Sequence, residues 1–102
     1  MSYIEELREV IRHLHGAEAT HAESVPVKEQ FQGRTVWDGV VEVFTLHGHP
    51  RAERVYAWSH DVDSPKPTKR HVTILHTDDV SSPVLAVRAF IIQEFRNRAI
   101  EN

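Results

Sequence analysis

The sequence predicts an α+β domain in the order α-β-β-β-β-α, a four-stranded antiparallel meander with two terminal helices packed on one face. Apolar residues repeat with a helical period near both ends of the chain and with a period of two between residues 20 and 77. The apolar runs of this middle part are joined by short connections, which is typical of antiparallel neighbours. With 102 residues and no internal repeat, range 1–102 is expected to form a single domain.

The first helix is predicted over residues 3–15. Ser2 and Glu5 form the S-x-x-E capping box, and Gly16 follows the last turn, where a left-handed residue commonly ends a helix. One face of this helix is apolar and the other is charged. The apolar face consists of Tyr3, Ile4, Leu7, Val10, Ile11 and Leu14.

Four strands are predicted next, at residues 21–31, 35–46, 52–61 and 69–77. Pro26 has no backbone donor, so the first strand belongs at a sheet edge or contains a bulge. The second and third strands carry apolar side chains on both faces. We therefore expect one sheet face to stay partly apolar and open, with Trp37 or Trp58 on or near it.

The second helix is predicted to begin after Ser81 or Ser82, with Pro83 in its first turn, and to end near Ala99. It carries two apolar stripes with Arg88 between them: Val84, Val87, Ile91 and Phe95, and Leu85, Ala89 and Ile92. A helix with two apolar stripes is expected to meet two surfaces. A homodimer is the simplest way to cover the second helical stripe and the open sheet face.

Composition excludes several function classes. The formal net charge of -3 provides no general field for nucleic acid, although protonation of the eight histidines would reverse its sign. Without cysteine, no disulfide, thiolate metal site or cysteine nucleophile is possible, and a cytoplasmic location is expected. The N-terminal residues are acidic and amphipathic, and no apolar run reaches the length of a membrane span, so neither secretion nor membrane insertion is expected. The sequence contains no phosphate-binding loop, G-x-S-x-G elbow or H-E-x-x-H motif.

The leading hypothesis is a binding or interaction module that self-associates and has no catalytic activity. Its candidate interface or ligand residues are Tyr56, Trp58, Leu85, Arg88 and Ile92. Because Arg88 is a charged residue among apolar neighbours, three roles are possible for it. Its side chain can extend to solvent, pair with a buried acid, or contact an anion of a ligand or second subunit.

A metal site is the second hypothesis. His47 and His49 with Glu53 resemble the first half of the cupin metal motif, without its flanking glycines or its second half, and imply a divalent-metal protein or a metal-dependent small-molecule enzyme. The alternative is a solvated turn with two polar tips. Other histidines in the strands are expected to make cross-strand contacts.

Two further groups of charged residues have structural and functional interpretations. Asp38 and Glu42 are too far apart along one strand for a paired acid/base site. We expect them to contact polar side chains of the next strand, or Arg88. A third functional hypothesis assigns a nucleic-acid contact to the basic residues near the third hairpin: Lys66, Lys69 and Arg70.

The chain also resembles a group of small uncharacterised bacterial proteins in three stretches. These are Thr35–Phe44 (TVWDGVVEVF), Gly48–Ala52 (GHPRA) and Tyr56–Ser59 (YAWS). The resemblance implies a bacterial origin, and it implies no activity because none is assigned to that group.

Overall fold

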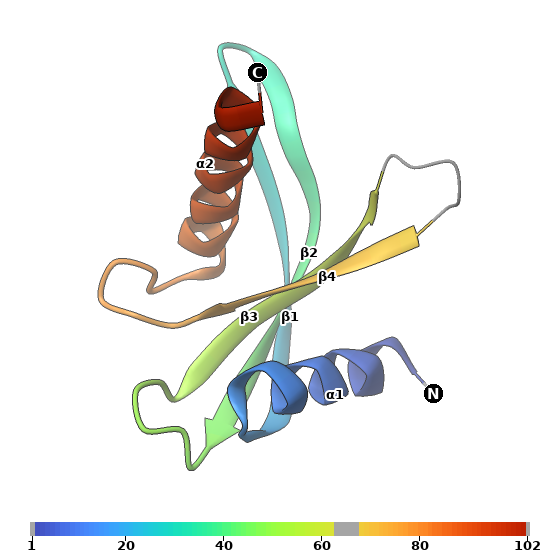
Figure 1. Cartoon of the computed structure of the whole chain (residues 1–102), viewed down its shortest axis with the longest axis vertical. Coiled ribbons are helices and arrows are strands. Elements are labelled where there is room, and N and C mark those ends of the chain that lie inside the picture. Colours follow the sequence, from blue (N-terminus) through green and yellow to red (C-terminus); the bar gives the residue numbers. More distant parts are fainter. Residues whose placement is uncertain (1, 63–67, 102) are drawn as a thin grey trace.

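The computed structural model describes residues 2–62 and 68–101, and these residues form a helix, one four-stranded sheet and a second helix (Figure 1). The elements are α1 (Tyr3–His15), β1 (Glu18–Phe31), β2 (Arg34–His47), β3 (Arg54–Val62), β4 (Thr68–Leu75) and α2 (Pro83–Glu101). The α+β class and the order α-β-β-β-β-α are therefore confirmed. β1 starts earlier than predicted, because the chain pairs with β2 directly after Gly16 ends α1.

The sheet is an antiparallel meander in the order β1-β2-β3-β4. β1 and β2 pair along their whole length, with register shifts between His21 and Glu23 and between Glu29 and Gln30. By contrast, β2 and β3 pair only from Glu42↔Ala57 to Thr45↔Arg54. The β1–β2 hairpin and the β3–β4 pair consequently leave this shared segment in different directions (Figure 1).

The two helices pack on opposite faces of the sheet, so the expectation that they share one face is wrong. Successive side chains of a strand point to opposite faces. On β3, Val55 and Ala57 belong to the core beneath α1, whereas Tyr56 and Trp58 belong to the core beneath α2. The two apolar faces of the sheet thus reflect two cores within one chain, because each face has its own helix.

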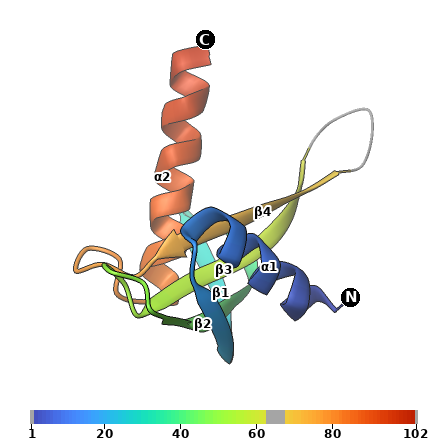
Figure 2. The ribbon, with the colours of Figure 1, turned by 60° about the horizontal axis from the view of Figure 1, so that its bottom comes forward.

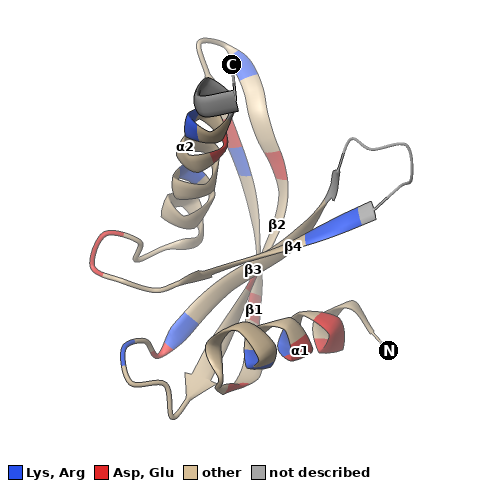
Figure 3. Cartoon of the chain, in the orientation of Figure 1, with Lys and Arg blue, Asp and Glu red and all other residues tan. Residues whose placement is uncertain are grey.

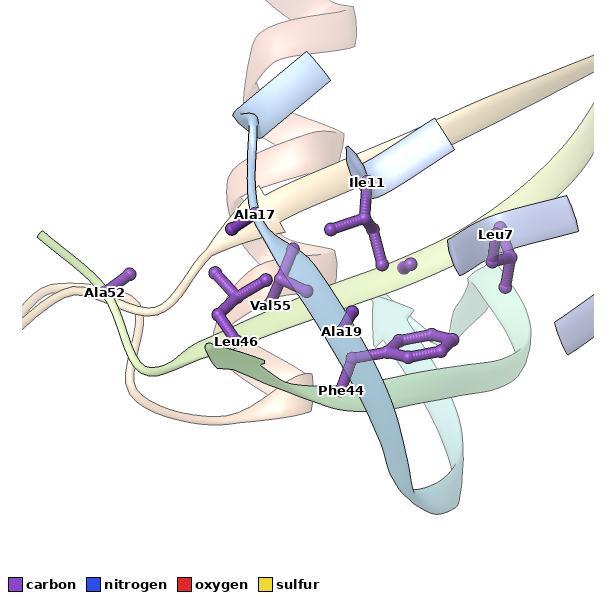
Figure 4. Packing of buried hydrophobic residues seen from close by; sticks show 9 residues of the cluster. Leu7, Ile11, Ala17, Ala19, Phe44, Leu46, Ala52 and Val55 are labelled. Carbon is purple, nitrogen blue, oxygen red and sulfur yellow. The ribbon is translucent and has the colours of Figure 1, made fainter. Parts of the chain in front are cut away.

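The first core lies between α1 and the sheet. Leu7 and Ile11 of α1 are fully buried and belong to one cluster with Phe44 and Val55 (Figure 4). The predicted caps of α1 are both present. The amide of Glu5 donates to the Ser2 hydroxyl at 3.2 Å, and Gly16 adopts the left-handed conformation with φ 65°.

The second core lies beneath the first half of α2, which begins at Pro83 as predicted. Ala86 and Val87 are fully buried against the sheet face that carries Tyr56 and Trp58. α2 then continues along the β1–β2 hairpin (Figure 1) and projects away from α1 (Figure 2). Only one side of this apolar helix packs on the sheet, so Ile92 and Phe95 remain exposed.

Candidate functional site

An apolar groove lies between the second half of α2 and the end of the β1–β2 hairpin. Ile92 and Phe95 line it from the helix, and Phe31 and Val36 line it from the hairpin, around a cavity of about 340 Å³. Phe31 is 62% exposed, Phe95 58% and Ile92 52%. Large apolar side chains this exposed in one place are a feature of binding surfaces.

The hairpin turn explains why Phe31 lies outside the core. Gln32 and Gly33 both have positive φ, at 51° and 76°, and reverse the chain between Phe31 and Arg34. Phe31 therefore occupies the last paired position of β1, beyond the buried part of the sheet. Sequence reasoning included Phe95 in an apolar stripe but missed Phe31 and Val36. A phenylalanine directly before a turn was the available signal.

Arg88 lies at the rim of this groove and pairs with a carboxylate. Its Nε donates to Oε1 of Glu29 on β1, whose side chain is largely buried. Of the three predicted roles, the structure shows the pairing with an acid. Ile92 lines the groove, whereas Leu85 is partly buried near the start of α2 and is not part of the groove lining.

Tyr56 and Trp58 were expected at an open interface, and this placement is wrong. Both side chains are buried beneath α2. The Trp58 ring makes edge-on contacts with Trp37 and Phe90, each at a centroid distance of 5.5 Å. The Tyr56 hydroxyl lies 2.7 Å from Nδ1 of His76, and burial raises the pKa of Tyr56 above its usual value. Both residues belong to the core because α2 covers this sheet face.

The structure does not assemble His47, His49 and Glu53 into a metal site. His47 Nε2 lies 2.8 Å from the Thr20 hydroxyl. His49 Nδ1 accepts the backbone N–H groups of residues 51 and 52, both at 3.0 Å, and so stabilises the turn after β2. Within residues 2–62 and 68–101, no group of three or more His, Cys, Asp or Glu side chains is arranged to hold a metal ion. The observed contacts are those of the alternative interpretation, a polar turn.

Of the three histidines predicted to make cross-strand contacts, His71 and His76 make them, whereas His60 packs against helix α2. His71 of β4 contacts Ser59 of β3, with 2.5 Å between Nδ1 and Oγ. His76 contacts Tyr56, and the ring of His60 packs edge-on against Phe90 of α2 at 5.3 Å. These histidines serve separate contacts on both faces of the sheet.

We expect His15 to make the stability of the fold depend on pH. Its Nε2 lies 2.8 Å from the Thr73 hydroxyl of β4, and its ring centroid lies 6.4 Å from that of His49. Burial and the neighbouring His49 lower the pKa of His15 below its ordinary value of 6.5. Between the lowered pKa and about 6.5 the unfolded chain binds more protons than the folded chain, so the free energy of unfolding falls as the pH falls through this window.

We therefore expect a lower urea midpoint at about pH 5 than at about pH 7.5, and a smaller difference in the variant His15→Gln. His13→Gln is the matched control, because His13 is exposed on the same helix. An equal pH dependence in all three proteins would show that His15 is not the group responsible.

Glu42 is the buried charged residue among those described, and its partners are on β1 rather than on β3. His21 Nε2 lies 2.9 Å from its Oε1, and the Ser24 hydroxyl donates to the same oxygen. The register shift between His21 and Glu23 brings both partners to one side of the strand. The expected contact of Glu42 with the next strand is thus wrong, because the bulge could not be located from the sequence.

The predicted nucleic-acid residues show no built site in the described part of the chain. Lys66 lies outside the described residues, and Lys69 and Arg70 are exposed on β4. Arg70 lies 3.8 Å from the carboxylate of Glu94 on α2. Lysine and arginine are spread over both helices and all four strands (Figure 3). This distribution does not form the basic stripe that phosphate backbones require.

No protein-family model, curated protein or solved structure matches the chain. Neither described helix has the length and apolar character needed to cross a membrane.

Proposed function

We propose that the chain is a non-catalytic interaction module that self-associates into a homodimer through the groove between α2 and the β1–β2 hairpin. The observation that carries this proposal is the joint exposure of Phe31, Val36, Ile92 and Phe95 around one cavity. The fold brings together residues of the β1–β2 hairpin and of α2, which are far apart in the sequence, to make this surface. Burial of the groove by a second copy would remove these side chains from water.

The size of the apolar surface suits the centre of a small dimer interface. With roughly 200 Å² for a whole phenylalanine, the exposed fractions of the four residues correspond to on the order of 400 Å². Standard interfaces bury about 800 Å² per partner, with an apolar centre and a polar rim. The Arg88–Glu29 pair at the edge of the groove supplies part of such a rim.

The proposal places the protein in the cytoplasm of a bacterium. The cysteine-free sequence supports the cytoplasm, and the resemblance to uncharacterised bacterial proteins supports the origin. The metal and nucleic-acid hypotheses receive no comparable support from the geometry of the described residues.

The variant Phe95→Glu tests the proposed interface. We expect the wild-type chain to form dimers in sedimentation equilibrium and native mass spectrometry, and Phe95→Glu to weaken the association at least about tenfold, because a carboxylate would be buried without a partner. Ile92→Glu is expected to act in the same way. Both residues are exposed, so circular dichroism and the urea midpoint of the monomer are expected to change little.

Leu14→Glu is the matched control, because Leu14 is 59% exposed on the other helix. It is expected to dimerise like the wild type. A wild-type mass of one chain at protein concentrations up to about 1 mM would contradict self-association. A divalent ion bound once per chain, and lost in the double variant His47→Ala/His49→Ala, would instead support the metal hypothesis.

A further inference from the structure

Part of β2 has a neighbouring strand on only one edge. β1 pairs with β2 up to Phe31↔Arg34, whereas the pairing of β2 with β3 ends at Glu42↔Ala57. Beyond that point β3 turns away together with β4 (Figure 1). Among the described residues, no strand pairs with the other edge of β2 before Glu42.

The register identifies which backbone groups face this free edge. Leu46 donates its N–H to the Glu53 carbonyl at 2.8 Å, so its backbone faces β3. Backbone groups of an antiparallel strand alternate between its two edges, so those of Glu42 face β3 as well. Val40 and Asp38 lie two and four residues before Glu42, so their N–H and C=O groups point to the same edge of β2. At these positions β3 no longer pairs with that edge.

On the opposite side of the gap, a side chain satisfies an open backbone group. On β3, Ser59 lies two residues after Ala57, the last residue that pairs with β2. Its backbone N–H therefore faces the same edge of β3, at a point where β2 no longer pairs with it. The hydroxyl of Tyr3, at the start of α1, accepts this N–H at 3.0 Å. No described side chain provides an equivalent contact to Asp38 or Val40.

The outer edge of β1 is protected, in contrast to the free edge of β2. Near its start, Arg8 donates its Nε to the Ala19 carbonyl at 2.9 Å. Further along, Pro26 pairs with Val40, so its nitrogen faces outward, where it offers no donor. Proline and covering side chains are common means by which proteins block strand edges. The free edge of β2 carries no proline, and Val40 is 46% exposed.

We propose that a second copy of the chain docks on this edge, with β2 pairing antiparallel to β2 of the partner across a two-fold axis. This inference rests on the proposed function, because it specifies how the homodimer forms. A strand edge is complementary to its own copy, since N–H and C=O groups recur at the same spacing. Val36 belongs to β2 and also lines the groove, so strand pairing and groove contact are parts of one continuous interface.

The variant Val40→Pro tests this arrangement. It removes an N–H that has no partner among the described residues of the single chain, so the monomer is expected to keep its circular dichroism and urea midpoint. The dimer dissociation constant is expected to rise at least about tenfold, because each protomer loses a hydrogen bond and meets a proline ring. Lys28→Pro is the matched control, because Lys28 lies opposite Asp38 and its N–H faces the outer edge of β1. It is expected to dimerise normally.

The results separate this inference from the proposed function. If Val40→Pro dimerises like the wild type while Phe95→Glu does not, strand pairing is wrong and association through the groove stands. If the wild type remains monomeric, both are wrong. If Val40→Pro does not fold, hydrogen exchange of the wild type tests the inference instead. Protection of the Val40 amide is expected to rise with protein concentration. A protection that does not rise overturns the inference. Protection only by a synthetic peptide of residues 35–42, with the chain monomeric, would also overturn it.

Discussion

Trp58→Ala is expected to lower the free energy of unfolding by about 3–5 kcal/mol, the range measured for large aromatic residues truncated in cores. The Trp58 side chain is 1% exposed and packs between Trp37 and Phe90. Its removal leaves a cavity that the rigid strand and helix cannot close. Domains of this size have a total stability of about 5–15 kcal/mol, so the variant is expected to lose a large share of its stability.

Urea denaturation followed by circular dichroism measures this loss, and the remaining Trp37 reports fluorescence from the same core. Leu14→Ala in the last turn of α1, where Leu14 is exposed, is the control and is expected to stay within about 0.5 kcal/mol of the wild type. The measurement is repeated over a range of protein concentrations. Substitution of a core residue destabilises the protein at every concentration, whereas substitution of a residue that acts only at the interface affects only the dimer. A loss below about 1 kcal/mol would contradict the assigned core position.

Local signals were sufficient to predict the ends of the helices. Ser2, Gly16 and Pro83 each act through their own backbone or nearest turn, so their meaning does not depend on the rest of the fold. The alternation of the strands likewise predicted the antiparallel meander. What failed was the assignment of faces. Val55 and Tyr56 show that β3 is apolar on both sides, but periodicity cannot say which side a helix 25 or more residues away will cover.

The candidate site was predictable only in part for the same reason. Ile92 and Phe95 could be identified from the excess of apolar residues on α2, because one sheet face cannot cover the whole circumference of a helix. Phe31 and Val36 join them only through the length of the hairpin, which a pattern of residues does not specify. Conversely, the spacing of His47 and His49 suggested metal chemistry. In the structure, the ring of His49 instead accepts hydrogen bonds from backbone N–H groups of the turn.

The second large effect is expected at Glu42. We expect His21→Leu to lower the free energy of unfolding by about 1–2 kcal/mol, because Glu42 would keep its buried position and lose a hydrogen-bond partner. The lower part of the range reflects the 30% exposure of the His21 side chain, which allows water to replace some of the lost contact. Urea denaturation of the purified variants at constant pH measures this difference.

The double variant His21→Leu/Glu42→Leu distinguishes a specific contact from general loss of packing. Removing one partner of a buried polar pair leaves the other without compensation, whereas replacing both with apolar residues of suitable size can be nearly neutral. The double variant is therefore expected to be more stable than His21→Leu alone. Glu42→Gln is the conservative control, because its amide oxygen can still accept from Ser24. If the two leucine substitutions simply add, His21 and Glu42 do not act as a pair, and the bulge in β1 serves the path of the strand rather than this contact.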